Sequence, residues 1–187
     1  MEEEINMYLD EARDLMNKAI KHFTGELVKI RAGKASPAIL EGLMVQYYGN
    51  PTPINQVASI TAPDARSLMI KPWEKNVIPE IEKAIINSDL GLNPQNDGEQ
   101  VIISIPQLTE ERRQNLVKQA KGEGEQGKIS IRNVRKETND NLKKLQKDGA
   151  SEDEIKRAED KVQALTDDFT KKIDELLEKK EKEIMTV

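Results

Sequence analysis

Five cations in the second half of the chain recur at helical spacing and could bind the phosphate groups of a nucleic acid. On a helical wheel they fall within a sector of about 100°, and the row extends for ~25 Å at ~1.5 Å per residue. Such a row can follow phosphates, and each neutralised phosphate releases counterions. We call this row the basic stripe; it consists of Lys118, Lys121, Lys128, Arg132 and Arg135.

The alternative is a helix face that is merely solvated, with Glu125 as an intrahelical partner of the cations. The net charge of −5 for the whole chain argues against a nucleic-acid binder, but the charge is unevenly distributed. Residues 106–136 hold eight Lys and Arg against four Glu, a net charge of +4. This basic segment in an acidic chain fits a local binding surface. The wheel alone does not decide between the two explanations.

A second pattern, at residues 122–128, matches GxGxxG and nearly matches a Walker A loop. Its context is wrong for nucleotide binding, because Ile129 stands where a magnesium-binding Ser or Thr is needed and no apolar strand precedes the glycines. Glu123 and Glu125 would also repel the phosphates. We therefore do not predict nucleotide binding here.

Other residues that could do chemistry are sparse. His22 is the only histidine, and the chain has no cysteine, so we expect no metal site, no cofactor and no catalytic residues. Trp73 is interpreted as a packing anchor for the small domain, with a platform for base stacking as the alternative. The sequence starts with an acidic run and has no apolar stretch of about 18 residues, which predicts a cytoplasmic protein that does not enter a membrane.

Long helices must position the stripe. The chain of 187 residues is 34% charged and only 3% aromatic, a composition typical of solvated helices with narrow apolar seams. Apolar residues alternate at spacings of three and four over residues 2–30 and 151–185, and a third helix begins near Thr109. Ser151 and Glu154 form a capping box. The third helix holds Gly122, Gly124 and Gly127, and the sequence leaves open whether they interrupt it.

The middle of the chain has a different character. All eight prolines lie within residues 31–105 or at their exit, between short β-branched runs and one helix near residues 77–88. The fold class is therefore α+β. We expect an elongated three-helix bundle from residues 1–30 and 106–187, with residues 31–105 inserted as a small β/α/β domain.

Several segments carry a family resemblance that spans nearly the whole chain. They are IRAGKASP at 30–37, YYGNPTP at 47–53, DLGLNP at 89–94, LTEERR at 108–113, IRNVR at 131–135 and KEKEIM at 180–185. In these segments and their spacing the chain resembles the ribosome recycling factor family. The resemblance implies an L-shaped monomer of tRNA size that binds large-subunit ribosomal RNA between the subunits. It also implies joint action with elongation factor G and GTP.

The resemblance also assigns residues. It implies RNA contacts for Arg132 and Arg135, which lie in the basic stripe, and more weakly for Arg113, which lies off it. It implies a two-strand hinge between the domains, formed by Arg31, Ala32, Gly33, Lys34, Ala35, Ile105, Pro106 and Gln107. The function expected is that of a factor without enzymatic activity. A helical RNA-binding or coiled-coil adaptor, with a protein-docking middle domain, is the alternative.

Overall fold

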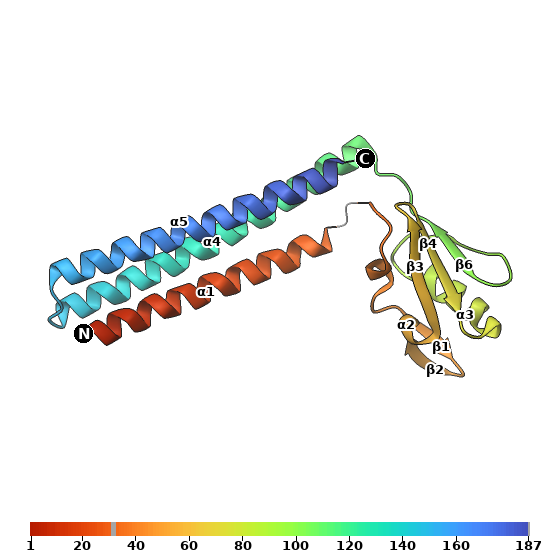
Figure 1. The fold of residues 1–187 in the computed structure, drawn as a ribbon, viewed down its shortest axis with the longest axis horizontal. Coiled ribbons are helices and arrows are strands. Elements are labelled where there is room, and N and C mark those ends of the chain that lie inside the picture. Colours follow the sequence, from red (N-terminus) through yellow and green to blue (C-terminus); the bar gives the residue numbers. More distant parts are fainter. Residues whose placement is uncertain (31–32, 187) are drawn as a thin grey trace. The chain divides into compact units, whose positions relative to one another are not determined.

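The computed structural model describes residues 1–30 and 33–186, which fold into two compact units (Figure 1). The first unit comprises Met1–Ala32 and Glu110–Val187, and the second comprises Gly33–Thr109. The first is helical and the second holds the β-strands. In the described part of the chain, no helix is both long and apolar enough to cross a membrane. The fold is α+β, as expected, with the sheet domain inserted into a helical bundle.

The bundle consists of α1 (Glu2–Lys29), α4 (Glu110–Lys147) and α5 (Glu152–Met185), which lie side by side (Figure 1). Each helix buries a narrow apolar stripe and exposes the rest of its surface. Met16 of α1, Ile131 of α4 and Ile173 of α5 are all 0% exposed. Burying one such side chain stabilises the fold by ~1.5–3 kcal/mol, so the seam and not the charged surface holds the bundle together.

Helix α4 runs without a break through its three glycines. Gly124 and Gly127 are buried, and a β-carbon at either position would lie 3.1 Å from a side chain of α5, Leu177 or Ile173 respectively. Gly122 faces open space. The glycines at 124 and 127 therefore let the neighbouring helices approach closely and do not interrupt the helix.

The turn between α4 and α5 follows the sequence pattern. Gly149 has φ of 112°, which favours glycine. Ser151 Oγ accepts a hydrogen bond from the backbone N–H of Glu154 at 3.2 Å, and Glu154 Oε2 accepts one from the N–H of Ser151 at 3.3 Å. The predicted capping box is confirmed.

The second unit is built on an antiparallel sheet whose strands lie in the order β3 (Ala58–Asp64), β4 (Ser67–Pro72), β6 (Val101–Ser104) and β5 (Pro94–Asn96). The centre of its core is formed by side chains that are 0% exposed: Leu68 and Ile70 of β4, Ile103 of β6, and Ile81 and Ile85 of helix α3 (Ile78–Ile86). The elements are η1 (Pro37–Leu40), β1 (Met44–Tyr47), β2 (Asn50–Pro53), α2 (Ile54–Val57), β3 (Ala58–Asp64), β4 (Ser67–Pro72), η2 (Lys75–Val77), α3 (Ile78–Ile86), β5 (Pro94–Asn96) and β6 (Val101–Ser104).

Candidate nucleic-acid interface

The basic stripe lies along the solvent side of α4. Lys118, Lys121 and Arg132 are exposed, whereas Lys128 and Arg135 are half-buried. The seam residues of the same helix lie beside the stripe, and Leu116, Ala120 and Ile131 are at most 5% exposed. The continuous helix keeps the five cations in one row, because no break rotates its two halves relative to each other.

Carboxylates stand beside the stripe. Lys121 Nζ lies 3.9 Å from Glu181 Oε1, and Lys128 Nζ lies 2.6 Å from Asp174 Oδ1. Both carboxylates belong to α5 and were not predicted from the sequence. In each pair one side chain is exposed and the other half-buried, and ion pairs this open to water contribute about 0–1 kcal/mol, so phosphate groups could displace the carboxylates at little cost.

The arginines of the stripe have their own partners. Arg132 Nη2 lies 3.7 Å from Glu125 Oε2, so Glu125 is an intrahelical partner of the stripe. Arg132 Nε also donates to the carbonyl of Lys128 at 3.4 Å. Arg135 Nη1 donates to Gln163 Oε1 of α5 at 3.4 Å. These contacts hold the guanidinium groups over the α4 surface, where further N–H groups remain to donate to an incoming phosphate.

Arg113 stands apart from the stripe. It is half-buried, and its Nε atom is buried with no hydrogen-bond partner among the described residues. On the helical wheel it points toward the seam and not toward Arg132 and Arg135. The geometry thus brings the five stripe residues together and leaves Arg113 outside them.

The glycine-rich segment 122–128 cannot cradle a nucleotide phosphate. A phosphate loop needs backbone N–H groups that point to the ligand, as at a helix N-terminus. Residues 122–128 lie in the interior of α4, where these groups bond to carbonyls of the preceding turn. The GxGxxG match is therefore accidental.

The described residues give no support to acid–base or metal chemistry. They contain no group of three or more His, Asp or Glu side chains that could hold a metal ion. Lys29 Nζ donates a hydrogen bond to Glu26 and so lowers the pKa of that carboxyl. The backbone N–H groups of Glu99 and Gln100 lower the pKa of Asp97 in the same way. Each shift has a local cause on the surface, and neither carboxyl lies in the stripe.

The two segments that the family resemblance assigns to a hinge both form hydrogen bonds to the turn between β3 and β4. The N–H of Ala35 donates to the carbonyl of Ala65 at 2.8 Å, and the N–H of Ile105 donates to the carbonyl of Arg66 at 2.7 Å. Asp64 Oδ1 shapes this turn by accepting a 2.8 Å hydrogen bond from the N–H of Arg66. One turn of the sheet therefore holds both segments.

The other residues assigned to the hinge differ in exposure. Gly33 is half-buried, whereas Lys34, Pro106 and Gln107 are exposed. Arg31 and Ala32 lie outside the described residues.

Comparisons with known proteins give matches that span both units of the chain. A family model described as Ribosome recycling factor matches residues 23–185. The chain is 60% identical to the ribosome-recycling factor of Cytophaga hutchinsonii, over 99% of this chain and 100% of that protein. It is 54% identical to the ribosome-recycling factor of Flavobacterium johnsoniae, over the full length of both.

Solved structures give the same result. The chain resembles a solution structure of ribosome recycling factor, with a TM-score of 0.76, 40% identity and 98% of each chain covered. It also resembles the T. thermophilus ribosome recycling factor in a structure described as that factor and E. coli elongation factor G bound to the E. coli post-termination complex. There the TM-score is 0.61 and the identity 48%, with 97% of this chain and 99% of the other covered.

Proposed function

The chain belongs to the ribosome recycling factor family, and we propose that it binds the post-termination ribosome through the basic stripe on α4. With elongation factor G and GTP, it promotes dissociation of the ribosome into subunits and release of the mRNA. The RNA it contacts is that of the large subunit, at the space between the subunits. It acts in the cytoplasm, as a monomer and without an active site of its own.

The observation that carries this proposal is the row of five cations on one uninterrupted helix. Ribosomal RNA presents a regular row of phosphates, and a rigid row of Lys and Arg can contact several of them without ordering a flexible loop. Arg132 and Arg135 supply planar guanidinium groups, which bind phosphate oxygens in pairs. Lys118, Lys121 and Lys128 extend the charged surface toward the start of α4.

Joint action with elongation factor G requires a part of the protein that moves relative to the anchored bundle. The second unit is suited to this role because its core is separate from that of the bundle. Its two connecting segments are short, and both are held at the β3–β4 turn. We therefore assign the hinge to these segments. A few residues at the ends of such segments can absorb the change in backbone angles during a domain rotation.

The test is direct. Purified protein, elongation factor G and GTP are mixed with post-termination ribosomes, and the separation of subunits is followed by light scattering. We expect splitting that needs all three components, and binding of the protein to isolated large subunits that weakens as salt rises. Binding to ribosomes without any splitting would instead favour an RNA-binding adaptor.

A further inference from the structure

Helix α5 carries a carboxylate at every seventh residue. The spacing of seven is close to two helical turns, so the side chains remain on one side of the helix and drift by only ~20° per repeat. We call this series the acidic row; it consists of Asp153, Asp160, Asp167, Asp174 and Glu181. Asp153 lies in the first turn of α5, where an acidic residue also favours the positive end of the helix dipole.

The basic stripe contains a matching series of seven. Lys121, Lys128 and Arg135 are seven residues apart on α4, which runs antiparallel to α5. Moving toward the C-terminus of α4 from Lys121 therefore corresponds to moving toward the N-terminus of α5 from Glu181. The ion pairs follow this register: Lys121 contacts Glu181, and Lys128 contacts Asp174.

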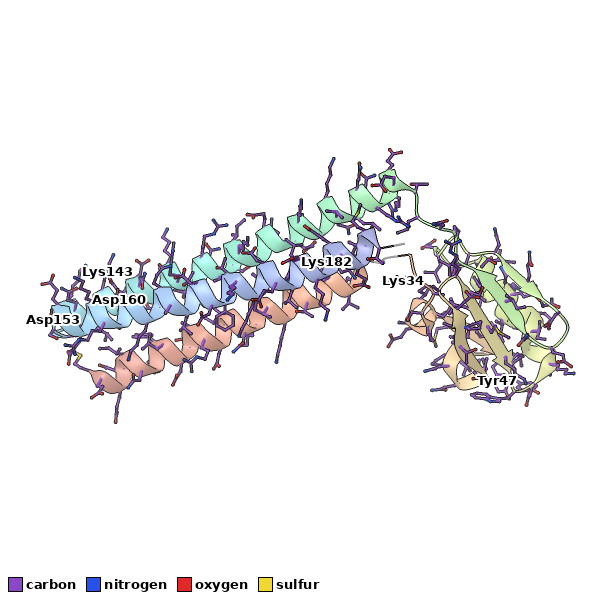
Figure 2. The ribbon with its side chains drawn as sticks, turned by 45° about the horizontal axis from the view of Figure 1, so that its top comes forward. Lys34, Tyr47, Lys143, Asp153, Asp160 and Lys182 are labelled. Carbon is purple, nitrogen blue, oxygen red and sulfur yellow. The ribbon has the colours of Figure 1, made fainter. Side chains whose placement is uncertain are left out.

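The third position of the register is bridged by a glutamine. Arg135 Nη1 donates to Gln163 Oε1 at 3.4 Å, and Gln163 Nε2 donates to Asp167 Oδ1 at 2.9 Å. The next step of seven on α4 is Leu142, which is fully buried, while the acidic row continues to Asp160 and Asp153. These two lie near the end of the bundle where α4 turns into α5 (Figure 2). Three of the five carboxylates thus border the stripe.

Bundle stability alone does not account for these contacts. Each pair joins one exposed and one half-buried side chain: Lys121 and Glu181 are 62% and 30% exposed, and Lys128 and Asp174 are 23% and 56% exposed. Ion pairs that remain this open to water add only about 0–1 kcal/mol to folding. Their position, however, is unfavourable for RNA binding, because a carboxylate beside the stripe repels the phosphates that the stripe attracts. A row of carboxylates along one side of the basic stripe therefore lowers the affinity of the stripe for RNA. It also disfavours an approach of the RNA from that side.

We propose that the acidic row is a counter-charge that competes with ribosomal RNA for the basic stripe. In the free protein, Asp174 and Glu181 hold Lys128 and Lys121 in place. On the ribosome, the lysines exchange these carboxylates for phosphates, and the nearby negative charge limits the affinity, so that the factor can leave after the subunits separate. The row also fixes which side of α4 the RNA approaches. This inference rests on the proposed function.

The test compares two double variants with the same change in charge. Asp174→Asn with Glu181→Gln removes the carboxylates that contact the stripe and keeps the shape of each side chain. Asp168→Asn with Glu175→Gln is the matched control, since both residues lie on α5 but line a groove with Arg13 of α1. Binding to isolated large ribosomal subunits is measured for each variant over a salt series. A thermal melt of each variant checks that the bundle is intact.

We expect the first variant to bind roughly two- to tenfold more tightly than the unchanged protein at low salt, and to dissociate more slowly. The control should change affinity much less, because its charges lie farther around the helix. Unchanged affinity, weaker binding or an equal effect of the control would overturn the inference. If the double variant is unstable, Asp174→Asn alone decides by the same criterion. If the unchanged protein shows no salt-dependent binding to large ribosomal subunits, the proposed function itself is overturned.

Discussion

The backbone of Gly33 packs directly against the side chain of Leu108, and a β-carbon added at Gly33 would lie 2.5 Å from Leu108 Cγ. Gly33 also has φ of +76°, a conformation that side chains rarely adopt. The two residues come from the two segments that lead into and out of the second unit. Their contact therefore joins these segments at a place where only glycine fits.

Gly33→Ala should lower the free energy of unfolding of the second unit by ~1–3 kcal/mol, because it adds both backbone strain and a steric clash. Urea unfolding of the full chain measures the change. The clash can be separated from the strain with Leu108→Ala, since the double variant should lose less stability than the sum of the two single variants. Strictly additive effects would show that Leu108 moves aside without cost.

The three glycines of α4 should respond differently to alanine. Gly122→Ala should raise stability by ~0.5–1 kcal/mol, because the position is exposed and open and alanine favours the helix. Gly127→Ala should destabilise the bundle, since its β-carbon would lie 3.1 Å from Ile173 Cδ1 and Ile173 is fully buried. Gly124→Ala should fall between them because Leu177, its close neighbour, is only half-buried.

Thermal melts of the three single variants give the order directly. The expected order of melting temperature is Gly122→Ala, then Gly124→Ala, then Gly127→Ala. An increase for Gly127→Ala as large as that for Gly122→Ala would mean that α4 and α5 separate easily. The close approach at Gly127 would then be unimportant for the bundle.

Arg132→Ala and Arg135→Ala should each weaken binding to large ribosomal subunits by ~1–3 kcal/mol, the cost of a charge-assisted hydrogen bond to phosphate. The slope of affinity against salt should also become shallower, because fewer counterions are released. Arg157→Ala on α5 is the control, as it removes an equal charge from an exposed position outside the stripe. Normal binding by the Arg132→Ala, Arg135→Ala double variant would contradict the assignment of the stripe.

The sequence predicts the bundle better than it predicts the sheet domain. Apolar residues at spacings of three and four place the seams of α1, α4 and α5, because a helix has one repeating geometry. In contrast, β2 contains Pro51 and Pro53, which read as turn residues in the sequence. Among the described residues β2 pairs with β1 alone, so it is an edge strand. The alternation of the hairpin places both prolines at positions where the strand needs no N–H for pairing.

The candidate site is predictable in part, because the regular geometry of one helix fixes how residues along it are placed. The spacing of cations places the stripe on one face of α4, since all five residues lie on one helix. The carboxylates of α5 that contact Lys121 and Lys128 depend on the register between two helices, which the spacing within α4 does not contain. A repeat of seven among the acidic residues of α5 is the signal that could have identified Asp174 and Glu181.

Asp64→Ala should impair ribosome splitting while leaving ribosome binding intact. The Asp64 carboxylate accepts the N–H of Arg66 and so shapes the turn whose Ala65 and Arg66 carbonyls hold the two connecting segments. Without it, the turn is less ordered, and movement of the second unit is transmitted less directly to the bundle. The basic stripe lies in the other unit and is unchanged. We expect the splitting rate with elongation factor G and GTP to fall several-fold.

Asp64→Asn distinguishes this role from a simple loss of charge. Asparagine retains a side-chain oxygen at the same place and can accept the same hydrogen bond, as Asn and Asp both do in tight turns. The Asp64→Asn variant should therefore split ribosomes at nearly the normal rate. A general loss of stability would lower the melting temperature and the binding together, whereas loss of positioning would lower splitting alone. If Asp64→Ala splits ribosomes as fast as the unchanged protein, the β3–β4 turn does not position the hinge, and the mobility of the second unit must be controlled elsewhere.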